Sequence, residues 1–401
     1  MKVLMVNKFL YPKGGAETYT FAVGDMLKEH GHIVQFFGLR NPKNTVGNDA
    51  NAYVADMDFS AGILKNLNAP FRIIYNSQAR KEIRKVLNLF QPDVVHLNNI
   101  HYHLTPSIIL EIDKWRRQSN KKCIIIYTTH DYQLICPSHG LFDKNMKPCE
   151  LCLDGKYRHC VQTKCLKNSR AKSLLGTLDG YFWKSSKVYS LVDIYLCCSQ
   201  FIKRKLDTQD RFRGRTVCIH NFKNVPPISN IHKKDYILEF GHLSKDKGTD
   251  TLIEVAKRMP QRKFVFIGYG ESIKKMEGIS NIKYLGFKTG DELNRLIAEA
   301  AISVCPSEQY ENCPYSVIES ILYKTPVVGA NMGGIPELID TGKTGELFEA
   351  GNVDGLEQAI STILGNLDYY TEQCELVEFE NAETYYKKLI KLYREGKVNA
   401  E

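Results

Sequence analysis

The chain has 401 residues, of which 43% are apolar and 25% are charged, the composition of a soluble globular protein. At this length we expect two domains of ordinary size, each with a core of its own. No apolar run approaches about 18 residues, which excludes a membrane-spanning helix. The first residues, MKVLMVNKF, predict a strand and lack the pattern of a signal peptide. We therefore expect a cytoplasmic protein.

The net charge of +9 is distributed unevenly along the chain. Residues 1–220 carry 33 Lys and Arg against 18 Asp and Glu, whereas residues 221–401 carry 21 against 27. The basic half can face a lipid phosphate, a membrane surface or a nucleic acid, or it can be a solvated surface without a partner. Because the basic residues are scattered and do not form one tract, a nucleic-acid arm is disfavoured.

The first half of the sequence predicts strands that alternate with helices. A glycine loop at residues 12–15 follows the first strand, and Gly14 and Gly15 allow close approach of a backbone, although such turns are also common without a function. The loop lacks G-x-G-x-x-G, so a dinucleotide fingerprint is not supported. Residues 41–75 predict an irregular flap. We expect strands over residues 3–7, 32–38, 91–98, 122–128, 193–199 and 216–221, and helices over 16–30, 79–90, 106–119, 169–192 and 200–206.

The second half repeats this alternation after a linker at residues 222–235, where two prolines and several charges break both periodicities. The alternation predicts an α/β fold with parallel sheets. We expect strands over residues 236–240, 263–268, 281–286, 301–305 and 326–329, and helices over 249–259, 291–300, 353–364 and 382–394, with one more beginning near 314.

Two carboxylates mark the stretch from residue 306 to 337. Glu311 lies in the loop before the expected helix, and Glu319 lies inside it. Asn312 is a plausible N-cap and Pro314 suits the first turn, so the amides that follow, at Tyr315 and Ser316, lack intrahelical partners. Together with the helix dipole, these amides predict an anion site. The alternative is a buried helix with two solvated glutamates.

This stretch resembles the C-terminal signature of retaining nucleotide-sugar glycosyltransferases of family 4. The usual form there is E-G-F-G-x4-E, followed by G-x-P-V-V and G-G-x-x-E. The matches here are Glu311, Glu319, TPVV at 325–328 and GGIPE at 333–337. The departure is Asn-Cys-Pro at 312–314 in place of the glycine-rich part, so a phosphate has to use amides other than that of the proline.

Further stretches resemble the same family in the same order. They are KGGAE at 13–17, PDVVH at 92–96, His130–Asp131, GHLSKDKG at 241–248, GYG at 268–270 and GKTG at 342–345. The resemblance covers nearly the whole chain. It implies a GT-B fold, in which two Rossmann-like α/β domains face a cleft. The implied parts are an acceptor-side domain at 1–221, the linker, a nucleotide-sugar domain at 236–380, and a helix at 381–401 that returns to the first domain.

The resemblance implies transfer of a hexosyl group with retention of configuration, without a catalytic metal or cofactor. The donor would be a UDP- or GDP-sugar, and the acceptor a glycan or a lipid-linked glycan. The expected setting is bacterial capsule or O-antigen synthesis, with peripheral contact at the inner face of the membrane and no nucleic-acid partner. Alternatives are a nucleotide-sugar epimerase of the same fold, and a basic zinc-containing protein that binds nucleic acid.

Three residues take catalytic roles by this resemblance. Lys247 would stabilise the leaving diphosphate, and Glu311 would contact the donor sugar near its anomeric centre. His130 follows a predicted buried strand, at the edge where open α/β sheets place their ligands, and would lie beside the sugar and the acceptor. A histidine at a strand end is otherwise more often structural. No residue is an obvious nucleophile, which favours same-face attack assisted by the leaving phosphate.

Other matched residues take binding roles. His242 stands where the family has an arginine, so a bidentate guanidinium is missing and the histidine would hydrogen-bond the phosphate. Glu319 would hold the ribose hydroxyls, and Gly268 would lie near the nucleobase. Gly14 and Gly15 would line the donor and acceptor cleft.

A cysteine-rich insert at residues 136–165 follows the histidine. We expect it to hold a structural Zn²⁺ through Cys149, Cys152, Cys160 and Cys165, with Cys136 as a substitute ligand. An Fe–S cluster and free thiols in a loop are the alternatives. A similar insert occurs in some bacterial polysaccharide glycosyltransferases of this family.

The segment at residues 169–192 combines Lys and Arg with Leu, Tyr, Phe and Trp. Such a helix can lie on a membrane surface and present a lipid-linked acceptor. Packing of the helix on the sheet is the interpretation we prefer from sequence.

Overall fold

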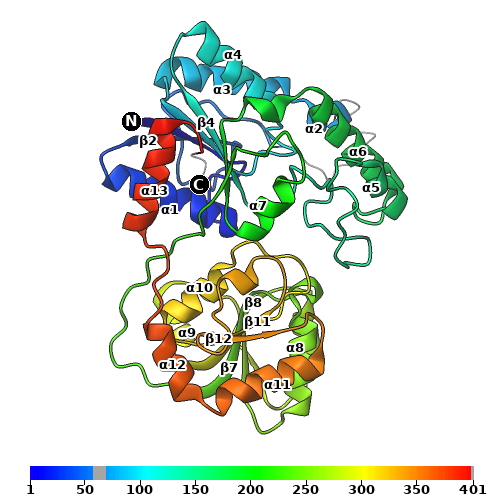
Figure 1. Cartoon of the computed structure of the whole chain (residues 1–401), viewed down its shortest axis with the longest axis vertical. Coiled ribbons are helices and arrows are strands. Elements are labelled where there is room, and N and C mark those ends of the chain that lie inside the picture. The colour runs from blue at the N-terminus through cyan, green and yellow to red at the C-terminus, as the bar shows by residue number, and fades with distance from the viewer. Residues whose placement is uncertain (57–68, 399–401) are drawn as a thin grey trace. The chain divides into compact units, whose positions relative to one another are not determined.

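The computed structural model describes residues 1–56 and 69–398, and the chain divides into two α/β units (Figure 1). The N-terminal unit comprises residues 1–145, 149–220 and the chain from 383 onward. The C-terminal unit comprises residues 146–148 and 221–382. Each unit contains a six-stranded sheet in which all strands pair in parallel. The expectation of two Rossmann-like domains is confirmed.

The sheet of the N-terminal unit has the order β2-β1-β3-β4-β5-β6. Its central strands are continuous apolar runs because helices cover both faces of a parallel sheet, and every residue of Ile124–Thr129 is buried. The strands are β1 Lys2–Val6, β2 Ile33–Phe37, β3 Val94–Leu97, β4 Ile124–Thr129, β5 Ile194–Cys197 and β6 Thr216–Cys218. The helices are α1 Gly15–Glu29, α2 Ala69–Ile74, α3 Ser77–Phe90, α4 Ser107–Gln118, α5 Arg158–Thr163, α6 Arg170–Ser185, η2 Val188–Leu191, α7 Gln200–Leu206 and, from the end of the chain, α13 Ala382–Glu395.

The C-terminal helix α13 packs on the N-terminal unit beside α1 (Figure 1). The hydroxyls of Tyr385 and Tyr19 are 2.6 Å apart, and the Tyr393 hydroxyl lies 2.6 Å from Nδ1 of His96. Tyr385 and Tyr393 are both buried. These contacts confirm the expected return of the last helix.

The sheet of the C-terminal unit has the order β12-β11-β10-β7-β8-β9. Its strands are β7 Lys234–His242, β8 Phe264–Tyr269, β9 Ile282–Tyr284, β10 Ala300–Cys305, β11 Val327–Ala330 and β12 Gly345–Phe348. Its helices are η3 Lys245–Lys247, α8 Thr249–Arg258, η4 Glu271–Met276, α9 Gly290–Glu299, α10 Tyr315–Leu322, η5 Ile335–Glu337, α11 Val353–Leu364 and α12 Leu367–Glu375.

Every strand and helix expected from the sequence is present, and seven further elements lie among the described residues. These are the short helices α2, α5 and α12, the 3₁₀ helices η3, η4 and η5, and the strand β12, which has four residues. Short elements carry too few turns or alternations for a periodic signal. Helix α2 lies within residues 41–75, so the expectation of an irregular flap is wrong there, and residues 57–68 of that flap lie outside the described residues. Among the described residues, we find no helix with both the length and the apolar character to cross a bilayer.

Candidate functional site

The candidate site of the C-terminal unit lies at the carboxyl edge of its parallel sheet, where such sheets bind ligands. Strand β7 ends at His242 and leads into η3, β8 ends at Tyr269, and β10 ends at Cys305 before the loop that carries Glu311. Because β7 pairs with both β8 and β10, the three loops start from neighbouring strands. The sequence motifs therefore meet at one edge.

Lys247 and Glu311 form an ion pair at this edge. Nζ of the lysine lies 2.5 Å from Oε1 of the glutamate, and Ser307 Oγ donates to the same oxygen at 3.0 Å. Burial lowers the pKa of Lys247, but the charge and hydrogen bond of Glu311 outweigh it and hold the pKa above its ordinary value. The lysine is therefore a fixed positive charge over the physiological pH range.

Two glycines allow the loops around this pair to touch. Gly248 has φ of +76°, and a Cβ there would lie 1.8 Å from the carbonyl oxygen of Pro306. Gly333 has φ of +65°, and a Cβ there would lie 2.1 Å from the carbonyl oxygen of Glu311. The amide of Gly334 donates to that same carbonyl at 2.7 Å. The backbone of Glu311 is thus held by the glycine loop that follows β11.

Helix α10 begins two residues later than an N-cap at Asn312 requires. Pro314 is the N-cap, with φ of −67° and ψ of 123°, and no side chain caps the helix. The prediction of Asn312 as N-cap is wrong. The physical reason is that Asn221 holds the preceding residue, since its Nδ2 donates to the carbonyl of Cys313 at 3.1 Å and the chain turns only after Pro314. Tyr315 and Ser316 are then the first two residues of the helix.

Glu319 forms its own ion pair with a residue that the sequence did not single out. Its Oε1 lies 2.7 Å from Nζ of Lys223, and only 15% of the glutamate side chain is exposed. Lys223 Nζ also lies 5.8 Å from the centre of the Tyr315 ring. The sequence carries no local signal for this pair, because its members are far apart along the chain.

Exposed aromatic rings follow β8 and β9. Tyr269 is 53% exposed and Phe287 is 66% exposed, and their ring centres are 5.9 Å apart. The His242 ring is 5.2 Å from that of Tyr269, and its Nδ1 lies 3.1 Å from Ser244 Oγ. The prediction gave roles to Gly268 and His242 in this region but not to the two exposed rings. That glycine has φ of +141° and no room for a side chain, since a Cβ would lie 1.8 Å from the carbonyl oxygen of Gly241.

In the N-terminal unit, His130 follows β4 directly. Its Nε2 lies 2.9 Å from Oδ1 of Asn98, and its ring packs 4.8 Å from the Tyr19 ring. Burial lowers the pKa of His130 to about 3, so its imidazole is neutral at physiological pH. Gly14 is the N-cap of α1 and Gly15 its first residue, in the loop after β1. All three residues therefore lie beyond carboxyl ends of strands in one sheet.

The cysteine-rich insert forms a small core of sulfur and aromatic atoms. Cys152, Cys160 and Cys165 pack with Tyr157, and the Sγ atoms of Cys160 and Cys165 are 2.6 Å apart. Cys149 is half-buried, and all the cysteines are free thiols. Within the described part of either unit, no three ligand atoms of His, Cys, Asp or Glu lie within 4.8 Å of one another. The donor types fit Zn²⁺, but binding requires side-chain rotation.

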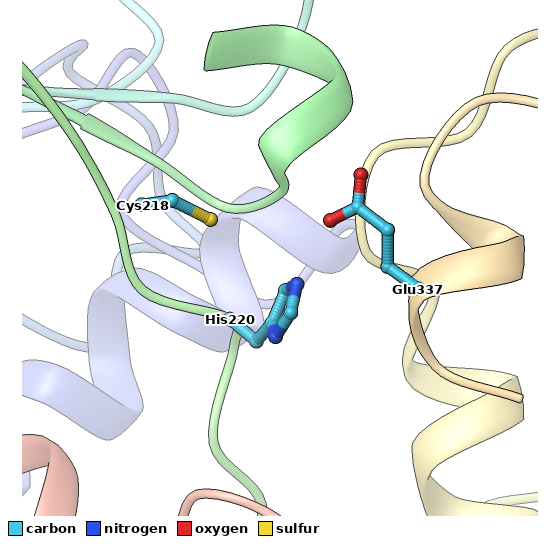
Figure 2. A group of neighbouring side chains, drawn as sticks. All are labelled: Cys218, His220 and Glu337. Carbon is cyan, nitrogen blue, oxygen red and sulfur yellow. The ribbon is translucent and has the colours of Figure 1, made fainter. Parts of the chain in front are cut away.

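Figure 2 shows three further side chains of ligand type. Cys218 and His220 lie at the end of β6 and just beyond it in the N-terminal unit, whereas Glu337 ends η5 in the C-terminal unit. They belong to different units, and no common site is assigned to them.

Comparison with known proteins identifies the family. Residues 13–225 match the model described as Glycosyltransferase Family 4, and residues 221–397 match the model described as Glycosyl transferases group 1. The chain belongs to glycosyltransferase family 4. An uncharacterized 42.6 kDa protein in the cps region of Klebsiella pneumoniae is 24% identical to this glycosyltransferase over 84% of the chain and 87% of that protein.

Two other proteins extend the comparison. The amylovoran biosynthesis glycosyltransferase AmsK of Erwinia amylovora is 29% identical over 33% of the chain and 36% of its own length. The structure of Anabaena Alr3699/HepE in complex with UDP and glucose matches with a TM-score of 0.65 at 16% identity, covering 98% of this chain and 99% of that one. At this identity the structural match shows the fold alone. It confirms the GT-B architecture of the family-4 enzyme.

Proposed function

We propose that this glycosyltransferase moves a hexosyl group, with retention of configuration, from a UDP- or GDP-sugar to a glycan or lipid-linked acceptor. The ligands named for HepE support a nucleotide-sugar donor. The names of the Klebsiella and Erwinia relatives support a role in bacterial surface polysaccharide synthesis. The observation that carries the proposal is the Lys247–Glu311 pair at the carboxyl edge of the second sheet.

Transfer releases a nucleoside diphosphate, so negative charge grows on the leaving group. Lys247 supplies a permanent positive charge, and the uncapped N-terminus of α10 supplies the positive end of a helix dipole. In our proposal these groups and His242 stabilise the diphosphate, without a catalytic metal. Glu311 already accepts from Lys247 through Oε1, and its carboxylate would take hydroxyls of the donor sugar.

The nucleoside would bind next to the diphosphate. Glu319 would accept hydrogen bonds from the ribose hydroxyls while Lys223 holds its carboxylate in place. The exposed rings of Tyr269 and Phe287 would stack against the base, beside Gly268. The two rings would give a planar base an apolar contact surface. Such stacking does not depend on a particular sequence motif.

The proposed retaining step uses no protein nucleophile. The acceptor hydroxyl would attack the face from which the diphosphate leaves, and the departing phosphate would take the hydroxyl proton. His130 is a neutral imidazole, so it can exchange hydrogen bonds with the sugar and the acceptor but adds no charge. Gly14 and Gly15 would leave room for sugar close to the backbone of the N-terminal unit.

The decisive experiment measures nucleotide release from UDP-, GDP- and ADP-sugars, with and without an acceptor glycan. Release that depends on the acceptor, with an α-linked product from an α-linked donor, supports retaining transfer. A new nucleotide sugar formed without acceptor favours the epimerase alternative. Binding of nucleic acid, with no binding of any nucleotide sugar, favours the zinc-containing nucleic-acid-binding alternative. Full activity in EDTA supports metal independence, whereas activity rescued only by Mg²⁺ or Mn²⁺ contradicts it.

We further propose that the insert holds one structural Zn²⁺ through Cys149, Cys152, Cys160 and Cys165. Three of these thiols already share a buried core with few aliphatic side chains, as in metal-stabilised loops. Cys149 and Cys152 form the two-residue spacing of a metal knuckle. Cys136 is the substitute, and its Sγ lies 3.1 Å from Ser138 Oγ.

A further inference from the structure

Helix α6 is inverted relative to an ordinary surface helix. Its buried residues are mostly small or polar: Ser173, Gly176, Thr177, Asp179 and Trp183. Its exposed residues include two leucines, a tyrosine and a phenylalanine, whereas a surface helix of a globular protein normally buries such side chains. The exposed fractions are 49% for Leu174, 51% for Leu178, 36% for Tyr181 and 45% for Phe182.

The inward face is small because the cysteine-rich insert packs closely against it. A Cβ on Gly176 would lie 2.5 Å from Leu166, and one on Gly180 would lie 2.7 Å from the Tyr157 ring. Thr177 Oγ1 donates to the carbonyl of Tyr157 at 3.0 Å. The helix is therefore anchored by its small and polar residues together with Trp183, and four large side chains are left outside.

The exposed side chains follow helical spacing. Leu174, Leu178 and Phe182 are separated by four residues each, so they form one stripe along the helix, and Tyr181 lies beside it. We call these four residues the α6 apolar face. Helix α2 lies beside α6 (Figure 1) and carries another exposed aromatic residue, Phe71, which is 75% exposed. Monomeric proteins rarely leave such a stripe uncovered.

Among the described residues of α6 and the turn that follows it, the exposed charges all have one sign. Arg170, Lys172 and Lys184 lie on the exposed parts of the helix, and Lys187 follows its end. The single acidic residue of α6, Asp179, is buried. A cationic border around leucine and aromatic side chains fits an anionic lipid surface. It disfavours a second copy of the chain, because the two borders would repel each other.

We propose that the α6 apolar face docks on an anionic bilayer, with Leu174, Leu178 and Phe182 in the boundary between headgroups and acyl chains. Tyr181 suits the same depth, since its ring is apolar and its hydroxyl is polar. The inference goes beyond the proposed transfer reaction and needs no particular donor or acceptor. If the acceptor is lipid-linked, docking brings the enzyme to it.

The test is flotation of the full chain with vesicles of phosphatidylcholine, alone or mixed with phosphatidylglycerol. We expect about ten-fold or greater preference for the anionic vesicles at low salt. Leu178→Asp should lower binding to them by about ten-fold or more. The matched control is Leu89→Asp on α3, which changes a leucine that is 61% exposed outside this face and should leave binding intact.

Three results would overturn the proposal. They are absence of vesicle binding, equal binding by wild type and Leu178→Asp, and concentration-dependent dimers that Leu178→Asp disrupts, which would assign the face to a second copy. Circular dichroism and nucleotide release from the sugar donor in detergent-free buffer are measured on the same samples. Normal donor turnover by Leu178→Asp separates failure of docking from failure of the proposed transferase activity.

Discussion

The candidate donor site and the cysteine-rich insert are assembled in opposite ways. At the donor site, Gly248 and Gly333 bring two backbones into contact, and the Lys247–Glu311 pair is already formed. In the insert, thiols and an aromatic ring replace an aliphatic core, and α6 turns its leucines outward. A site preorganised by backbone contacts needs no partner to take shape. The described residues of the insert form no aliphatic core of this kind. We infer that its stable structure depends on the metal or surface that it binds.

This difference predicts where substitutions act. Changes at the donor site should reduce turnover and leave the fold intact. Changes in the insert should alter metal content, stability or membrane binding while the donor site stays competent. A donor-site substitution that lowers stability, or an insert substitution that lowers turnover, would show that the two regions are not independent.

The largest effect on activity is expected for Lys247→Ala. Loss of the permanent charge beside Glu311 should reduce kcat by about 100- to 1,000-fold, as for removal of one donor that stabilises a developing anion. Steady-state kinetics measure this loss, with the nucleotide sugar that the release experiment identifies as the donor. Lys245→Ala is the matched control, since Lys245 is an exposed lysine in the same turn and should retain activity. Equal losses in both variants would mean that the loop, and not Lys247, matters.

The next effect concerns the insert. Cys152→Ser should lower bound zinc from about one equivalent to near none and lower Tm, because metal binding and folding of a thiol core are coupled. Elemental analysis and thermal unfolding measure it, and Cys123→Ser, at a buried cysteine outside the insert, is the control. Cys149→Ser and Cys136→Ser compare the two candidates for the fourth ligand.

Three outcomes would contradict the zinc proposal. A metal-free wild type with all thiols titratable supports the free-thiol alternative. A metal-free wild type that lacks two thiols indicates a disulfide between Cys160 and Cys165, whose sulfurs are 2.6 Å apart. Iron and sulfide in place of zinc support the cluster alternative.

Glu319→Ala should weaken nucleotide binding about ten-fold and change kcat less, because it removes an acceptor for ribose hydroxyls and not a group at the anomeric carbon. Calorimetry with the nucleoside diphosphate measures the affinity. Lys223→Ala sharpens the result, since it breaks the ion pair but keeps the carboxylate. If Lys223→Ala weakens binding as much as Glu319→Ala, the glutamate orients the lysine and does not hold the ribose.

Glu311→Ala should act the other way and mainly slow turnover, because its carboxylate is placed beside Lys247. Steady-state kinetics and nucleotide affinity, measured together, separate the two glutamates. Wild-type kinetics for both variants would show that the site assignment is wrong.

The same comparison explains what the sequence could predict. The paired glycines and the alternating strands were predictable because local backbone demands leave short motifs, whereas Lys247 and Glu311 were named through the resemblance to the family. Lys223 and Phe287 were not, since each meets its partner only through the fold. The N-cap at Asn312 was wrong because Asn221, 91 positions earlier in the chain, holds Cys313.

Helix α6 shows a further limit of pattern analysis. Its sequence supports an amphipathic helix, and we preferred packing of the helix on the sheet. Apolar periodicity identifies two faces but does not say which one is buried. Gly176 and Gly180 decide the matter, because only the face without bulky side chains can approach Leu166 and Tyr157. The helix is packed, but Gly176, Thr177 and Gly180 contact Leu166 and Tyr157 and not the sheet that we expected.

The smallest effect on activity is expected for a buried acid of the C-terminal unit, which should act on stability instead. Glu239 on β7 is 4% exposed, Thr249 Oγ1 donates to its Oε1 at 2.7 Å, and its Oε2 has no hydrogen-bond partner among the described residues. Burial raises the pKa of Glu239 to about 8 from an ordinary value of 4.5, against the opposing Thr249 hydrogen bond and with the nearby Asp250 charge adding to the rise.

Between pH 4.5 and 8 the folded protein therefore keeps a proton that the unfolded chain releases. The free energy of unfolding should fall as pH rises through this window, by up to about 1.4 kcal/mol per pH unit. Glu239→Gln should remove that slope and be the more stable protein above pH 8, whereas Glu254→Gln, an exposed control on α8, should keep it. Urea unfolding at several pH values measures the slope. An unchanged slope in Glu239→Gln would show that the acid is already ionised in the folded state, and that this sheet tolerates a buried charge.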